Sequence, residues 1–262
     1  FIRKNKYSLL MENEFLKFYV NYANYHITKN IEFLKSEYGT KLLKEVERFC
    51  ELWSKAKSLA LKAFRSGKEE SIMRLVIDFI WFPSLFSLPM NILVSASDSV
   101  TRMIRFILEG LELGLVLDCA DEFKNLSLEE KLEIAKEFNS KGSLRLTKYK
   151  DKSKYDKESD DKESLRLVDL LGKLLEENTL RELKRFYGMI SEKWFHASTY
   201  LTNLMTDESI KEWPPPKVLY FPPLEERKDE ADELTEILRE FNKYEDILIK
   251  EWVKRYVGEN VK

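Results

Sequence analysis

A row of charged residues crosses the most apolar part of the sequence. Between Ser97 and Cys119, five charged residues recur at spacings of four, three, four and three: Asp98, Arg102, Arg105, Glu109 and Glu112. Such spacing places side chains on one face of an α-helix. Arginines beside glutamates could bind a phosphate and orient a general acid or base. The row is therefore the first place to look for a polar site.

One of the two histidines could complete such a site. The candidate site residues are Arg102, Arg105, Glu109 and His196. In a catalytic site His196 would act as general base or acid, Glu109 would orient it, and the arginines would bind a phosphate. Two structural alternatives are open. We favour an internal network in which His196 pairs with Glu109, and the other alternative is a solvated row of ion pairs along the helix.

Several familiar catalytic and metal-binding motifs are missing from the sequence. It has no glycine-rich phosphate loop, no Gly-x-Ser-x-Gly segment and no Cys-x-x-Cys pair. The Glu-x-x-His motif of di-iron bundles is missing too, because Ala23 and Lys193 stand three residues before the histidines. Cys50 and Cys119 lie in apolar patterns and fit buried thiols in a reducing cytoplasm better than a disulfide. We therefore expect no cofactor, no metal and a cytoplasmic location.

Part of the chain resembles helical proteins of prokaryotic defence and stress loci. In that pattern a helix with Arg-x-x-x-Glu precedes a later helix with Tyr-x-x-(Leu)-Ser-x-x-(Val)-His-x-Ser. The matching residues here are Arg105, Glu109, Tyr187, Ser191, His196 and Ser198. The spacing from Ser191 to His196 is longer than in the pattern, and Phe195 stands in place of Val.

Some of those helical proteins are related to the HEPN-type ribonucleases. The resemblance therefore implies a helical bundle and RNA cleavage. The catalytic signature of that family is an Arg followed four to six residues later by His. The nearest Arg before His196 is Arg185, eleven residues away, and no Arg has the required spacing before His26. The HEPN catalytic signature is thus absent from this sequence.

The composition fits a globular protein with an ionic surface. Hydrophobic residues make up 44% and charged residues 34% of the 262 residues, and the formal net charge is -2. A nucleic-acid partner is left open, but the net charge does not support it. Lys and Glu are abundant and Gln is absent, which is typical of a protein from a hot environment. A biased genome would give the same composition, and we favour the thermophile.

Apolar periodicity predicts an all-α fold, a bundle of about seven or eight helices with a long C-terminal helix. The predicted helices cover residues 7–38, 41–65, 68–82, 91 or 97 to 123, 128–138, 164–177, 179–205 and 225–257. Gly39 should end the first helix, while Thr40 and Asn178 should cap the helices that follow them. Ser127 and Glu130 have the spacing of a capping box.

An uncharged stretch in the middle of the chain raises the question of a membrane span. Residues 79–97 contain no formal charge over nineteen positions. Pro83 and Pro89 interrupt the stretch, and Asp98 closes it. We therefore predict a buried, bent hairpin between two helices in a soluble protein that makes no membrane contact.

The order of these patterns predicts three regions. Residues 1–212 should form a helical core with a charged loop near 145–163, residues 213–223 a proline-rich connector, and residues 224–262 a C-terminal helix packed on the core or on a partner. The apolar stripe of the last helix includes Leu248 and Trp252. That stripe fits packing along another long helix, in the same chain or in a second subunit.

We therefore predict an intracellular interaction or scaffold protein of a defence-related system. Its partner would be another protein or a second copy bound through the C-terminal helix. The alternative is a hydrolase or ribonuclease with the polar pocket of Arg102, Arg105, Glu109 and His196. A third class is a small-ligand pocket lined by the aromatic residues of the first helix.

Overall fold

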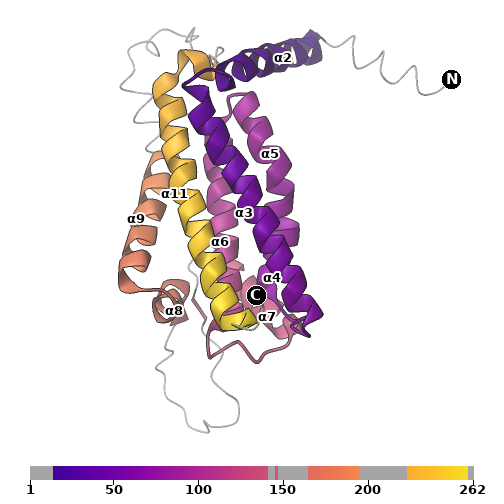
Figure 1. Cartoon of the computed structure of the whole chain (residues 1–262), viewed down its shortest axis with the longest axis vertical. Coiled ribbons are helices and arrows are strands. Elements are labelled where there is room, and N and C mark those ends of the chain that lie inside the picture. Colours follow the sequence, from indigo (N-terminus) through magenta and orange to yellow (C-terminus); the bar gives the residue numbers. More distant parts are fainter. Residues whose placement is uncertain (1–13, 141–144, 147–164, 195–222, 259–262) are drawn as a thin grey trace, which may run out of the picture. The chain divides into compact units, whose positions relative to one another are not determined.

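A computed structural model of the chain describes residues 14–140, 145–146, 165–194 and 223–258. Within these residues every element is helical except one pair of two-residue strands (Figure 1). The strands are β1 (Arg145–Leu146) and β2 (Leu165–Arg166), which pair antiparallel with Arg145 opposite Arg166. The predicted all-α class and the long C-terminal helix are therefore confirmed.

The helices follow one another with short connections where both ends are described. In chain order they are α2 (Glu14–Leu34), α3 (Gly39–Arg65), α4 (Ile72–Val76), the π-helical turn η1 (Ile77–Trp81), α5 (Phe82–Leu93), α6 (Ser97–Cys119), α7 (Leu128–Ser140), α8 (Leu167–Leu174), α9 (Glu177–Trp194), the 3₁₀ turn η3 (Leu224–Glu226), α11 (Lys228–Trp252) and the π-helical turn η4 (Val253–Val257).

The chain divides into two compact units. The first contains Phe1–Phe49, Leu85–Met103 and Ile190–Arg239, and the second contains Cys50–Ser84, Ile104–Met189 and Glu240–Lys262. Helices α3, α5, α6, α9 and α11 each contribute residues to both units. The predicted division at 212 and 223 stays a prediction, since most of the connector and residues 147–164 of the charged loop lie outside the described residues.

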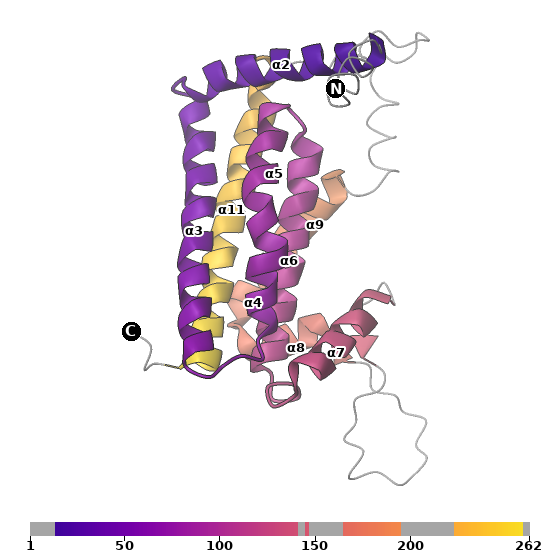
Figure 2. The ribbon, with the colours of Figure 1, turned by 90° about the vertical axis from the view of Figure 1, so that its right-hand side faces the viewer.

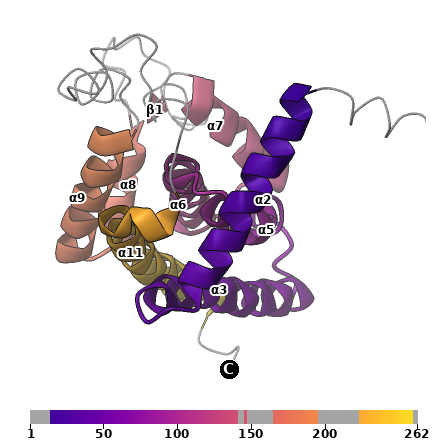
Figure 3. The same ribbon diagram turned by 90° about the horizontal axis from the view of Figure 1, so that it is seen from above.

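The first unit is joined through one buried asparagine. Helix α2 lies across the start of α3 and the α5–α6 connection (Figures 2 and 3). From α2, the Asn30 amide donates to the carbonyl of Leu93 and to the hydroxyl of Ser95, both at 2.8 Å. Its carbonyl oxygen accepts a hydrogen bond from the backbone amide of Leu224 at 2.9 Å. Ser95 also lies 3.0 Å from Nδ1 of His26. His26 therefore has a structural role at this junction.

Prolines do not bend the chain into the predicted hairpin, so that prediction was wrong. The chain is helical from Ile72 to Leu93, with Pro89 inside α5 and Pro83 in the first turn after η1. A π turn contains one extra residue per turn and commonly marks a local irregularity within a longer helix. Because η1 ends two residues before Pro83, the irregularity falls where a proline would disturb a regular helix.

Two predicted helix starts also differ from the structure, and one is confirmed. Gly39 begins α3, where the hydroxyl of Ser36 accepts a hydrogen bond from its amide at 3.1 Å, so Thr40 is not the cap. Asn178 likewise lies inside α9, which begins at Glu177. The capping box before α7 is present, with the Ser127 amide donating to the Glu130 carboxylate at 2.9 Å.

The predicted apolar stripe of α11 is buried in its own chain. Its members are all at most 3% exposed: Ala231, Leu234, Leu238, Phe241, Glu245, Leu248 and Trp252. A partner could reach this face only after the chain had unpacked. Self-association through the C-terminal helix stays a prediction.

Candidate functional site

The predicted site residues on α6 form ion pairs along the helix. Arg102, in the first unit, is exposed and lies 3.8 Å from the carboxylate of Asp98. Arg105, in the second unit, donates from Nε to the carboxylate of Glu109 at 2.8 Å. Both are pairs between residues four apart, the arrangement of a solvated helix face. His196 lies outside the described residues, so its predicted approach to Glu109 stays a prediction.

The last member of the charged row is buried. The side chain of Glu112 lies one turn beyond Glu109, and the residue is only 5% exposed. Burial, and then the charge of Glu109, raise its pKa to about 8, while the neighbouring Tyr187 hydroxyl acts in the opposite direction. The carboxyl of Glu112 is therefore protonated at neutral pH. From the sequence, Glu112 was predicted only as the last member of the charged row.

Helix α9 completes this group with a tyrosine. Burial and the nearby carboxyls of Glu112 and Glu109 raise the pKa of Tyr187 well above its ordinary value, so it keeps its proton. The guanidinium carbon of Arg105 lies 6.0 Å from the centre of the Tyr187 ring, within reach of a weak cation–π attraction. We call Arg105, Glu109, Glu112 and Tyr187 the α6–α9 polar cluster.

The α6–α9 polar cluster can donate a proton, but its guanidinium is already paired. Glu112 can donate a proton near neutral pH, because its pKa lies close to the surrounding pH. Arg105 and Glu109 are half-exposed and neutralise each other, so an anion would have to displace Glu109 from the guanidinium. Tyr187 was not among the predicted site residues, although the sequence carried a signal for it. It matches the tyrosine of the pattern described above, but the sequence could not place it beside Glu112.

A second buried carboxylate on the same helix was missed from the sequence. The carboxylate of Asp118 accepts five hydrogen bonds, from Ser71 Oγ (2.6 Å), Ile72 N (2.9 Å), Met73 N (3.1 Å), Trp252 Nε1 (3.0 Å) and Lys131 Nζ (3.3 Å). These donors come from α7, α11 and the start of α4, all within the second unit. The two backbone amides at the start of α4 would otherwise lack partners. Asp118 therefore ties the elements of this unit together.

The surroundings of Asp118 indicate a structural role. Lys131 is 1% exposed, donates to the carbonyl of Glu70 at 2.8 Å and lies 5.6 Å from the centre of the Tyr256 ring. Burial and then Asp118 raise the pKa of the neighbouring Cys119 thiol to about 12. A thiol that is neutral at physiological pH is a poor nucleophile and a poor metal ligand. The Cys119 thiol beside Asp118 is therefore unreactive.

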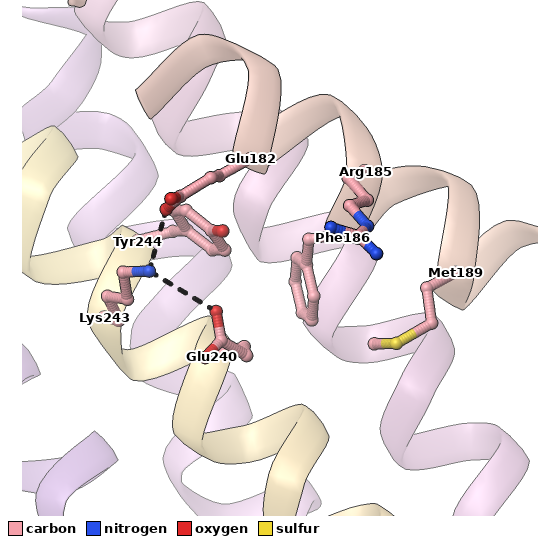
Figure 4. Close-up of a pocket in the computed structure, with 7 residues that line it drawn as sticks. All are labelled: Glu182, Arg185, Phe186, Met189, Glu240, Lys243 and Tyr244. Carbon is pink, nitrogen blue, oxygen red and sulfur yellow. Dashed lines mark hydrogen bonds and ion pairs between the residues drawn. The ribbon is translucent and has the colours of Figure 1, made fainter. Parts of the chain in front are cut away.

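An open groove between α9 and α11 is lined by charged and apolar side chains. Figure 4 shows its lining residues, which are Glu182, Arg185, Phe186, Met189, Glu240, Lys243 and Tyr244. Lys243 Nζ lies 2.9 Å from Glu182 and 3.6 Å from Glu240, so the ammonium bridges two helices. All three side chains are about half exposed. The groove is a solvated surface with an interhelical ion pair.

The uncharged stretch forms the exposed face of a helix. Four large apolar side chains follow at spacings of three, four and four, and are 42% to 73% exposed: Phe79, Phe82, Phe86 and Met90. We call these four residues the aromatic face. In the described part of the chain, Ile72–Leu93 is the one helix long and apolar enough to cross a membrane. It has 22 residues and a mean hydropathy of 1.5, and only a third of its most apolar window is buried.

The described residues contain no candidate metal site, and comparison with known proteins gives no family for the chain. Within the described residues, no three His, Cys, Asp or Glu side chains are grouped so that they could hold a metal ion. Comparison of the chain with protein-family models, with curated proteins and with solved structures finds no match.

Proposed function

We propose that the protein is a helical interaction protein that binds a protein partner through the aromatic face. The observation that carries this proposal is the exposure of four large apolar side chains in one row of a helix. Isolated exposed apolar residues are ordinary, but a contiguous apolar patch commonly marks an interaction site. The core of a protein interface is rich in aromatic residues and Met and poor in charge, as this face is.

The remaining features of the chain favour this function over catalysis. The α6–α9 polar cluster has a proton donor in Glu112, but its guanidinium, Arg105, is already paired with Glu109. Asp118 is saturated by structural hydrogen bonds. The stripe of α11 is covered by the chain itself. An intracellular, defence-related setting is part of the proposal and rests on the sequence resemblance alone.

Site-specific photocrosslinking tests the proposal. A benzophenone amino acid is placed at Phe86 of the full chain, and the control carries it at Leu61 on α3, a residue with 41% exposure. After illumination in extract of the source organism, mass spectrometry should identify one discrete protein adduct at position 86 and none at position 61. A second substitution, Phe79→Asp, should abolish the adduct. The absence of any protein adduct at position 86 would overturn the proposal.

A hydrolase or ribonuclease is the second candidate, and the protonated Glu112 favours it. In this hypothesis Glu112 donates a proton, Arg105 binds a phosphate, and His196 is the base. Hydrolysis of single-stranded RNA by the purified chain should then fall at least 10-fold in Glu112→Gln and stay unchanged in the exposed control Glu129→Gln. Equal rates for all three proteins, or no hydrolysis above buffer, remove this candidate.

A further inference from the structure

We infer that the aromatic face binds a second copy of this chain, with the two helices antiparallel about a two-fold axis. The inference rests on the proposed function and names the partner for that same surface. Most soluble oligomers are homo-oligomers, and two-fold dimers are the commonest of them. The area, the charge and the spacing of the face each support a second copy.

The exposed area of the face is sufficient for a weak dimer. A whole Phe side chain has roughly 200 Å² of surface to bury. With the exposed fractions of the four side chains, their exposed surface therefore adds up to about 450 Å². Pro83 is exposed beside them, and Ile80 and Leu85 are half-buried there. Two such faces in contact would therefore remove about 1,000 Å² from water, which is close to the lower limit for a specific interface.

The charge pattern makes the face compatible with itself. In a two-fold contact the same patch meets itself, so a patch of one charge sign would repel its copy. No charged residue occurs from Phe79 to Ser97, and the carboxylate of Asp78, just before the face, pairs with Lys57. The face therefore presents no unpaired charge of its own to a second copy.

The spacing of the four residues fixes the pairs that an antiparallel contact would form. Phe79, Phe82, Phe86 and Met90 lie along one helix, so their order does not depend on the rest of the fold. A two-fold axis through the middle of the row places Phe79 opposite Met90 of the other copy, and Phe82 opposite Phe86. Antiparallel helices also place opposite ends of their dipoles together.

Sedimentation equilibrium of the full chain at about 1–100 µM tests the inference, because an interface of this size is expected to dissociate in the micromolar range. Wild type should shift from monomer to dimer over this range. Phe86→Glu should weaken association at least 30-fold, since a charge would be buried without a partner. Leu61→Glu, at a similarly exposed apolar position on α3, should associate as wild type does. Circular dichroism should show the same helicity for all three.

A pair of complementary variants tests the predicted register. Phe79→Lys and Met90→Glu should each be monomeric alone at 30 µM, and an equimolar mixture should contain heterodimer, because each chain then places its new charge opposite the other's. A monomeric wild type at 100 µM overturns the inference. A dimer that Phe86→Glu does not weaken also overturns it. A third contrary result is a wild type that binds phosphatidylcholine vesicles but forms no dimer, while Phe86→Glu does not bind the vesicles.

The two proposals fail differently. If wild type is monomeric but an adduct to another protein forms at Phe86, the proposed function stands and the second copy is wrong. If wild type is monomeric and no protein adduct forms, both are wrong. An adduct between two copies of the chain supports both.

Discussion

Two acidic residues of α6 are buried six positions apart, yet their surroundings are opposite. Asp118 is 1% exposed and Glu112 is 5% exposed. Asp118 accepts hydrogen bonds from two backbone amides, a hydroxyl, an indole and an ammonium. Glu112 has another carboxyl, Glu109, nearby and one tyrosine hydroxyl beside it. Burial is thus common to both carboxyls, and the supply of donors is what separates them.

This difference separates a structural carboxyl from one that can donate a proton. A carboxylate surrounded by donors, as Asp118 is, holds several elements in place. A buried carboxyl with few donors keeps its proton at neutral pH and costs free energy as the pH rises. The sites for structure and for chemistry in the second unit are therefore two turns apart on one helix.

The largest effect is expected when the charge of Asp118 is removed. Asp118→Asn leaves the ammonium of Lys131 buried without its carboxylate, and it weakens the acceptor for the amides at the start of α4. Loss of one partner of a buried ion pair costs about 3–5 kcal/mol. Urea denaturation at pH 7 should show this loss. The control is Asp121→Asn, at a carboxylate that is 89% exposed, which should leave the free energy of unfolding close to that of wild type.

A double substitution decides whether that cost comes from the unpaired ammonium. Asp118→Asn combined with Lys131→Met removes both charges of the buried pair. The double variant should be more stable than Asp118→Asn alone, since no uncompensated charge is left in the core. If the double variant is less stable than wild type by the sum of the losses of Asp118→Asn and Lys131→Met, the two side chains are not coupled, and Asp118 acts through its other partners only.

Substitution of Glu112 should raise the free energy of unfolding above neutral pH, whereas substitution of Asp118 should lower it. In the unfolded chain its carboxyl ionises near the ordinary pKa of 4.5, and in the folded chain near 8. The native state therefore holds the proton more tightly between these values, and wild type loses stability as the pH rises from 4.5 to 8. The loss is at most about 4 kcal/mol. Glu112→Gln has no such proton, so this part of the pH dependence should disappear.

Urea denaturation at pH 4.5, 6, 7 and 8.5 measures this difference. The free energy of unfolding of Glu112→Gln, relative to wild type, should increase through the series and level off above pH 8. Glu129→Gln on α7, at an exposed position, should run parallel to wild type. A constant difference between Glu112→Gln and wild type across the series would show that Glu112 is ionised in the folded protein.

The sequence predicted the helices better than the contacts between them. Apolar periodicity and the Ser127–Glu130 capping box are local signals, and both were confirmed. The hairpin at Pro83 and Pro89 was wrong, because a π turn before Pro83 lets the helix continue. A rule that ends helices at prolines does not include such a local change in the helical turn.

The candidate site was predictable only along one helix. The Arg105–Glu109 pair follows from a spacing of four residues. The nearness of Tyr187 to Glu112 joins α9 to α6 over a long sequence separation, and nothing in the local sequence signals it. Asp118 was missed for the same reason, since its partners come from residues 71–73, 131 and 252.

The smallest and most specific effect should come from the neighbours of Glu112. Tyr187→Phe removes the one hydroxyl that lowers the Glu112 pKa, so the pKa should rise. Glu109→Gln removes the charge that raises it, so the pKa should fall. Carbon-13 NMR of labelled glutamate carboxyls measures both shifts. Each substitution should change the free energy of unfolding at pH 6 by only about 1 kcal/mol. An unchanged Glu112 pKa in both variants would mean that desolvation alone sets it, and the contrast with Asp118 would then not depend on the supply of donors.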